Sequence, residues 1–168
     1  MTGVVNNINL DKVDESKESF EKEKGHHYIE KKLNGEFQFE GSPSFTSTIQ
    51  TEMANFVLGA DEPSILGGRG IHVSPLTYVL YGIIACYANT LAIQCGLRNI
   101  VLKKLNLTGR LFYDIGPMLS NIDSPLINEL KIEVDADKDI REIVEISRQK
   151  CPALFLVERG IKTSVSQA

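Results

Sequence analysis

The chain has 168 residues, a formal net charge of −4 and 42% hydrophobic residues, which is one domain's length with enough apolar content to bury a core. This composition excludes a disordered chain and gives no electrostatic reason to expect nucleic acid or an anionic membrane as a partner. Three cysteines and no apolar signal-peptide segment argue against a secreted disulfide scaffold. We therefore expect a protein of the reducing cytoplasm. Because neither CxxC nor HxxxH occurs, we expect no metal site.

A charged segment of mixed sign comes first. Residues 11–32 read DKVDESKESFEKEKGHHYIEKK and hold few apolar positions. We expect a solvated helix or a mobile extension there, and divide the chain into a charged N-terminal extension (residues 1–32) and a domain (residues 33–168). Two roles remain open for the extension, a solubilising tail or an arm that packs on a partner subunit.

A β-hairpin is predicted next, on either side of the turn-like EGSP at residues 40–43. The positions that follow the strand pattern are Ile29, Leu33, Phe37, Phe39, Phe45, Ser47 and Ile49. Residues 59–70, GADEPSILGGRG, are rich in Gly and Pro and predict a loop.

The most apolar stretch, SPLTYVLYGIIACYANTLAIQCG, predicts a long helix. Ser74 suits the N-cap, Pro75 the first helical position and Gly96 the residue after the end. A helix of about 20 uncharged residues lies inside a core or in a membrane. Because polar residues such as Asn89 and Gln94 dilute its hydrophobicity, we expect a core helix and no membrane partner.

Strands and a helix complete an α+β pattern. Residues 97–113 predict a long strand, residues 126–134 a half-exposed antiparallel strand, and residues 160–166 a closing strand. Residues 135–151 turn helical, with an apolar stripe that ends at Cys151. The stripe consists of Ile140, Ile143, Val144, Ser147 and Cys151.

Helical geometry separates two of the three cysteines. Cys95 follows Cys86 by nine positions, which at about 100° per residue puts it on the opposite side of the helix. Cys151 lies on the apolar stripe and points inward, and Pro152 predicts a break at which a new helix starts and its free N–H groups can stabilise a thiolate. Cys86 and Cys151 could meet in the core, although ordinary buried thiols fit the spacing better.

The order of these parts resembles the OsmC/Ohr family of osmotically inducible protein C and organic hydroperoxide resistance proteins, over residues 33–166. The resemblance is carried by the Gly-rich loop leading into SPLTYVLYGIIACYANTLA, by SRQKCPALFLV, and by the spacing of Cys86 and Cys151. It implies an OsmC-like α+β fold, with antiparallel sheets wrapped around two central helices. It also implies an intertwined homodimer with active sites at the dimer interface.

Family members typically reduce organic hydroperoxides without a cofactor. The resemblance implies that Cys86 is the peroxidatic cysteine, whose thiolate attacks the O–O bond, releases an alcohol and becomes a sulfenic acid. Cys151 would then form a disulfide with Cys86, which a dithiol such as dihydrolipoamide reopens. An apolar wall that includes Tyr78, Ile83 and Tyr87 would bind bulky organic peroxides in preference to hydrogen peroxide.

One position departs from the family. The acidic residue that follows the helix-starting proline, and that often holds a thiolate-stabilising arginine, is Leu76 in this chain. Arg69, in GGRGIHVSP, is our candidate for that arginine. The departure keeps a second hypothesis open, an OsmC-like protein without efficient peroxidase activity that binds a small hydrophobic or thiol ligand or relays sulfur. A lowered pKa of Cys86 favours the enzyme and a raised pKa favours the binder. A third possibility is a structural domain whose cysteines only fill the core.

Overall fold

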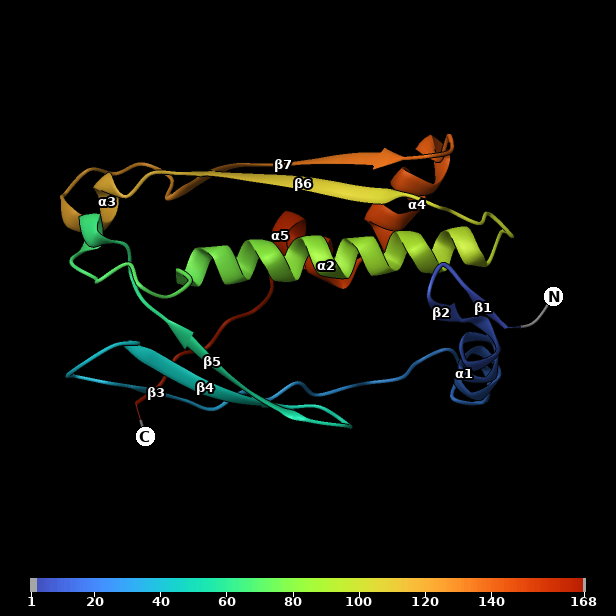
Figure 1. Ribbon diagram of the computed structural model, residues 1–168, viewed down its shortest axis with the longest axis horizontal. Coiled ribbons are helices and arrows are strands. Elements are labelled where there is room, and N and C mark those ends of the chain that lie inside the picture. The colour runs from blue at the N-terminus through green and yellow to red at the C-terminus, as the bar shows by residue number, and fades with distance from the viewer. Residues whose placement is uncertain (1–2, 168) are drawn as a thin grey trace. The chain divides into compact units, whose positions relative to one another are not determined.

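The computed structural model describes residues 3–167 and divides the chain into two compact units. Residues 3–25 and 82–167 form the first unit, and residues 26–81 form the second. The long helix α2 (Pro75–Gly96) begins in the second unit and ends in the first. Helices and antiparallel sheets occur together, as Figure 1 shows, so the predicted α+β class is confirmed.

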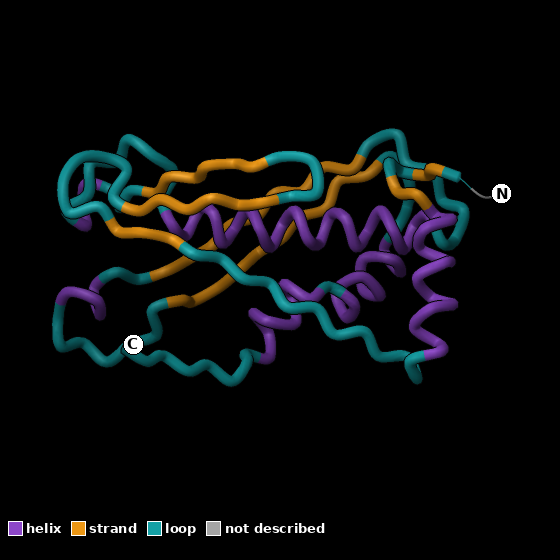
Figure 2. The backbone as a smooth tube through the Cα atoms, turned by 90° about the horizontal axis from the view of Figure 1, so that it is seen from below, coloured by secondary structure: helices purple, strands orange, loops and turns teal. Residues whose placement is uncertain are grey.

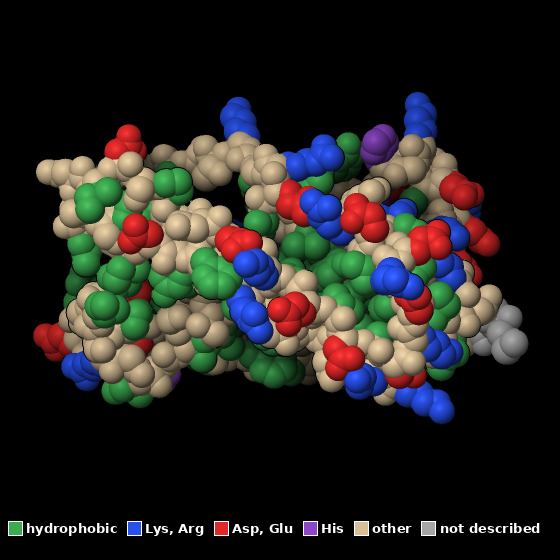
Figure 3. All heavy atoms as spheres, turned by 90° about the horizontal axis from the view of Figure 1, so that it is seen from above, with side chains coloured by type: hydrophobic (Ala, Val, Ile, Leu, Met, Phe, Trp, Pro, Cys, Tyr) green, Lys and Arg blue, Asp and Glu red, His purple; other side chains and the backbone are tan. Residues whose placement is uncertain are grey.

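A two-stranded antiparallel ribbon runs alongside α2 in the first unit (Figures 1 and 2). Its strands are β6 (Leu105–Tyr113) and β7 (Ile127–Ala136), with a register shift at Phe112 and Tyr113. Alternate side chains of the ribbon pack on the core, while the outer face carries interspersed positive and negative side chains (Figure 3). Three ion pairs lie along it, namely Lys104–Asp135, Arg110–Glu133 and Lys131–Glu129.

Two short helices pack on α2 in the same unit, α4 (Arg141–Lys150) and α5 (Pro152–Arg159). Cys151 separates them in an extended conformation, with φ −83° and ψ 116°. The break follows from Pro152, which disfavours helical geometry in the preceding residue and suits the first position of a new helix. The buried apolar core consists of Ile83, Tyr87, Leu91, Cys95, Ile140, Ile143, Cys151 and Leu154.

Residues 4–22 fold as a hairpin and a helix that belong to this unit. Strands β1 (Val4–Val5) and β2 (Ile8–Asn9) pair across a two-residue turn, and α1 (Leu10–Lys22) follows directly. Asn6 and Asn7 form that turn with φ of 53° and 61°, a conformation that asparagine tolerates better than most residues. Of the two forms predicted for residues 11–32, the solvated helix is present up to Lys22. The predicted boundary between residues 32 and 33 stays a prediction.

Asn6 fastens this N-terminal arm, residues 3–22, to the segment that follows α2. Its Nδ2 donates to the carbonyl oxygen of Ile100 (2.9 Å), and its Oδ1 accepts from the backbone N–H of Leu102 (2.8 Å). Leu10 is buried over Gly96, where a Cβ would lie 3.1 Å from the nearest Leu10 methyl carbon. A glycine at the end of α2 therefore lets the arm approach closely.

The second unit contains a three-stranded antiparallel sheet in the order β3 (Gly35–Phe37), β4 (Phe45–Gln50) and β5 (Asn55–Ala60). The predicted hairpin around residues 40–43 is confirmed, but its first strand starts at Gly35 and not at Ile29. Sequence periodicity does not reveal β5, because its NFVLGA run does not alternate between apolar and polar residues.

Three further expectations need correction. Residues 97–104 form no strand, so the predicted strand over 97–113 starts only at Leu105. Helix α2 includes Gly96, and the residue of positive φ after its end is Asn99, at 56°. Residues 160–166 form no strand, because no neighbouring backbone pairs with them in this chain, although their alternating pattern is typical of one.

Candidate functional site

Two cysteines that lie 65 positions apart in the sequence meet in the first unit. Cys86 is half-buried in the middle of α2, and Cys151 is completely buried between α4 and α5. The Cys151 thiol donates a hydrogen bond to Cys86, with 3.6 Å between the two sulfur atoms. A disulfide bond, at about 2.05 Å, requires the sulfurs to approach by roughly 1.5 Å. The structure thus brings together two of the three predicted catalytic residues.

Burial raises the pKa of the Cys86 thiol above its ordinary value. The backbone N–H of Ala153, in the first turn of α5, donates to Cys86 and opposes that rise, while the neighbouring Cys151 adds to it. The free N–H groups at a helix start are suited to stabilising a thiolate, as Pro152 suggested from the sequence. In this chain burial outweighs them, so Cys86 is mostly a neutral thiol at neutral pH.

The predicted wall residues of the first unit, Ile83 and Tyr87, are both buried in the core. The Tyr87 hydroxyl donates to the carbonyl oxygen of Val144 (2.8 Å), and burial raises the pKa of Tyr87 to about 12. Its hydroxyl is therefore occupied by the backbone of α4. The hydroxyl of Ser147, one turn before Cys151, is buried without a hydrogen-bond partner among the described residues.

The remaining predicted site residues, Tyr78 and Arg69, belong to the second unit. The Tyr78 hydroxyl donates to the carbonyl oxygen of Gly59 (3.1 Å), and its ring lines an apolar cavity of about 680 Å³ together with β4 and β5 side chains. Arg69 lies in an exposed loop before Gly70, whose φ is 63°. The predicted action of Arg69 on Cys86 remains a prediction.

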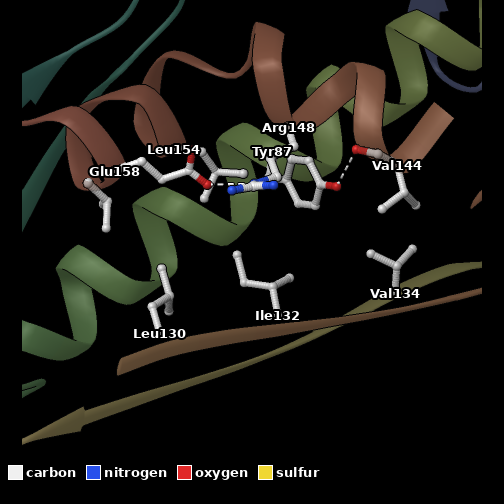
Figure 4. A pocket seen from close by; sticks show the side chains of 9 residues that line it. Tyr87, Leu130, Ile132, Val134, Val144, Arg148, Leu154 and Glu158 are labelled. Atoms are coloured by element: carbon white, nitrogen blue, oxygen red, sulfur yellow. Dashed lines mark hydrogen bonds and ion pairs between the residues drawn. The ribbon is translucent and has the colours of Figure 1, made fainter. Parts of the chain in front are cut away.

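A second cavity, of about 360 Å³, lies inside the first unit between β7 and the helices (Figure 4). Apolar side chains form most of its lining, and Arg148 and Glu158 add an ion pair between α4 and α5, with 2.7 Å from Nε to Oε1. Its lining residues are Tyr87, Leu130, Ile132, Val134, Val144, Arg148, Leu154, Val157 and Glu158. Sequence reasoning missed Arg148 and Glu158, because a spacing of ten positions across a helix break has no regular period that would align them.

The described residues also bear on two other features, a metal site and a membrane-spanning helix. No group of three or more His, Cys, Asp or Glu side chains within residues 3–167 is placed to hold a metal ion. Helix α2 is long and apolar enough to cross a membrane by length and composition. The core helix of a soluble protein passes the same test, so length and composition do not separate the two.

Comparison with solved structures shows the same fold in several proteins of low sequence identity. An organic hydroperoxide resistance protein OsmC from Legionella pneumophila is 14% identical, with a TM-score of 0.57 over 79% of this chain and 93% of its own. An OsmC-like protein from Mycoplasma pneumoniae is 20% identical, with a TM-score of 0.54 over 78% and 90%. An organic hydroperoxide resistance protein from Elizabethkingia anophelis is 17% identical, with a TM-score of 0.54 over 81% and 94%.

Sequence comparison identifies the family directly. No curated protein matches the chain. Residues 67–166, more than half of the chain, match the family described as OsmC-like protein. This stretch contains both cysteines of the thiol pair, the helix that carries Cys86, and the GGRG end of the Gly-rich loop before it. The resemblance found in the motifs around Cys86 and Cys151 is confirmed, and the chain belongs to the OsmC-like protein family.

Proposed function

We propose that this protein is a cysteine-based peroxidase that reduces organic hydroperoxides to alcohols. The observation that carries the proposal is the 3.6 Å separation of the Cys86 and Cys151 sulfur atoms, which come from distant parts of the chain. Two structurally similar proteins are named organic hydroperoxide resistance proteins, which supports the same substrate class here. The thiol pair of this chain is the main argument.

The proposed reaction has three steps. The Cys86 thiolate attacks the outer oxygen of the hydroperoxide, the O–O bond breaks, and the alkoxide takes a proton to leave as an alcohol. Cys86 is now a sulfenic acid. The Cys151 thiol displaces its hydroxyl as water, and the Cys86–Cys151 disulfide forms. A dithiol such as dihydrolipoamide reduces that disulfide and leaves as its own cyclic disulfide, which restores both thiols.

Other residues have proposed roles in this cycle. Arg69 would stabilise the Cys86 thiolate, and Tyr78, Ile83 and Tyr87 would contact the apolar part of the substrate. The cycle needs reduced thiols, which a reducing cytoplasm maintains, and we propose that location.

We also propose that the protein is a homodimer. Most residues of the apolar stretch of α2 are not buried within the chain, and Val79 and Tyr81 on that helix are exposed. Apolar surface of this extent needs a covering partner in a water-soluble protein, and a second copy is the simplest one. Light scattering coupled to size-exclusion chromatography should give twice the chain mass, whereas a mass of one chain contradicts the dimer.

A second candidate function has its own supporting observation. Leu76 replaces the family's acidic residue, and burial raises the pKa of Cys86. Both favour an OsmC-like protein that binds a small hydrophobic or thiol ligand, or relays sulfur, without efficient peroxidase turnover. The pH dependence of Cys86 alkylation in the wild type and in Arg69→Ala separates the candidates. A midpoint that is lower in the wild type supports the peroxidase, and a midpoint above 9.0 in both supports the binder.

The deciding experiment is a titration of the reduced protein with cumene hydroperoxide and with hydrogen peroxide, followed by free-thiol counting and mass-spectrometric disulfide mapping. We expect rapid loss of two thiols to a Cys86–Cys151 bond, faster with the organic peroxide. Cys151→Ser should retain the first oxidation and accumulate Cys86 sulfenic acid, but fail in sustained turnover. Slow and unselective oxidation of all three thiols would overturn the peroxidase and leave the second candidate.

A further inference from the structure

We propose that the cavity between β7 and the helices of the first unit binds a small amphiphilic carboxylate, with its apolar chain inside the cavity and its carboxylate on Arg148. Neither Cys86 nor Cys151 lines this cavity, so the proposal does not rest on the peroxidase reaction. Tyr87 is the one lining residue that it shares with the proposed substrate contacts. No step of the proposed cycle uses Arg148 or Glu158.

The floor and walls of the cavity suit an alkyl chain. Alternate residues of β7 form the floor, and Tyr87, Val144 and Leu154 project toward it from the helices above (Figure 4). The Tyr87 hydroxyl is already bonded to a backbone carbonyl, so the ring contributes only an apolar surface. A volume of about 360 Å³ is at the lower end of the range for ligand sites, which indicates a small ligand.

The polar groups of the cavity suit an anionic head group. Arg148 holds Glu158 through Nε (2.7 Å) and lies 3.6 Å from Glu145 through Nη1. Its Nη2 has no hydrogen-bond or ion-pair partner among the described residues. A guanidinium binds carboxylates with two parallel hydrogen bonds, and this one is among the residues that line the cavity.

The ion-pair arrangement favours a carboxylate over an amine. A ligand carboxylate can take the place of Glu158 on Arg148, which keeps the number of ion pairs unchanged. That exchange is easy, because the Arg148 and Glu158 side chains are 53% and 40% exposed, and exposed ion pairs are weak. An ammonium group would have to share Glu158 and Glu145 with Arg148, which already pairs with both of them.

Isothermal titration of the full chain with octanoate, octanol and octylamine tests the proposal with one chain length and three head groups. We expect octanoate to bind at least tenfold more tightly than the other two. Hexanoate should bind about 15-fold more weakly than octanoate, because each buried methylene contributes about fourfold in affinity. Equal binding of octanol, or tighter binding of octylamine, would overturn the assignment of a carboxylate.

Three variants test where the carboxylate and the alkyl chain of the ligand bind. Arg148→Met should weaken octanoate binding at least tenfold, and Glu158→Gln should tighten it, because the competing carboxylate is gone. Val157→Phe should block binding by filling the cavity without changing either charge. Arg110→Met is the matched control, since it removes an arginine from an equivalent Arg–Glu pair on the outer face of the same ribbon, and it should leave binding unchanged.

Each variant can contradict the proposal. Unchanged binding in Arg148→Met or Val157→Phe, or weaker binding in Glu158→Gln, would overturn it, provided that circular dichroism and thermal unfolding match the wild type. Because the readout is the heat of ligand binding and not peroxide consumption, failure here leaves the proposed peroxidase untouched. Failure of the peroxidase likewise leaves this site standing.

Discussion

Helix α2 carries one cysteine in its middle and one at its end, and the two regions differ in what surrounds the sulfur. Cys95, near the end, is completely buried in the core, and burial raises its pKa with only the charge of Arg98 opposing the rise. Cys86, in the middle, is half-buried and also has a raised pKa, but it contacts the Cys151 thiol and the Ala153 N–H.

The comparison shows that burial and pKa direction alone do not separate a structural thiol from a reactive one. Both cysteines lie in apolar surroundings with raised pKa values. What distinguishes Cys86 is a second thiol within reach and a helix start directed at its sulfur, two features suited to reversible oxidation. Cys95 has neither among the described residues, and the packing of the arm on its neighbour Gly96 makes this region a structural one.

The largest expected difference between the two regions is in peroxide consumption. Cys86→Ser should reduce turnover of cumene hydroperoxide to the background rate, because it removes the proposed attacking sulfur. Cys95→Ser, the matched control, should retain the wild-type rate. A coupled dithiol-oxidation assay measures both. Wild-type turnover in Cys86→Ser, or its loss in a folded Cys95→Ser, would reverse the assignment of the two regions.

A substitution that frees the N-terminal arm from the end of α2 should lower the free energy of unfolding. Asn6→Ala should lower the free energy of unfolding by about 2–3 kcal/mol, because the carbonyl of Ile100 and the N–H of Leu102 each lose a part-buried partner. Denaturant unfolding measures this effect. Asn7→Ala is the control, since Asn7 shares the positive φ, so the difference between the variants isolates the side-chain hydrogen bonds.

The rate of disulfide formation provides a second test of the role of Asn6. Asn6→Ala should leave the rate of Cys86–Cys151 disulfide formation unchanged, because the arm is bonded to the segment after the end of the helix and Cys86 lies in its middle. Equal destabilisation by the two asparagine variants would show that the Asn6 bonds contribute nothing. A slower disulfide in Asn6→Ala would show that the two regions are coupled.

Substitution of Tyr87, next to Cys86, should have the smallest effect on the free energy of unfolding, and this effect should depend on pH. Tyr87→Phe should lower the free energy of unfolding by about 1 kcal/mol at neutral pH, through loss of the bond to Val144. The folded-state pKa of about 12 lies above the ordinary 10.0, so the stability that Tyr87 contributes is present below pH 10 and is lost toward pH 12.

The deficit of Tyr87→Phe should therefore shrink and then reverse as pH rises through this window. Urea unfolding of both proteins between pH 8 and about 11.5 measures it, which covers most of the expected window. Tyr81→Phe, at an exposed position on the same helix, is the control and should show little pH-dependent difference. A constant difference between the wild type and Tyr87→Phe across the range would contradict the burial of the phenol.

Sequence patterns are reliable where a helix determines its own boundaries. Ser74 and Pro75 mark the start of α2, and Pro152 marks both the end of α4 and the start of α5, because the restrictions of proline are local to the chain. The inward direction of Cys151 follows from the apolar stripe of α4, since 3.6-residue periodicity needs no knowledge of the partner.

Strands and clusters are less predictable, because they depend on partners elsewhere in the chain. Residues 160–166 alternate like a strand and form none, while β5 forms without alternation because β4 pairs with it. The Arg148–Glu158 pair follows from the angle between two helices that no sequence pattern specifies.

The sequence by itself determined the α+β class, the helix that carries Cys86, the break at Cys151, and the motifs that place the chain in the OsmC-like family. Only the tertiary structure decided that the two sulfurs lie 3.6 Å apart, that Asn6 holds the end of α2, and that a cavity with an arginine lies beside β7. The physical reason is that capping and periodicity act within one element, whereas each of these contacts requires segments distant in sequence to pack together.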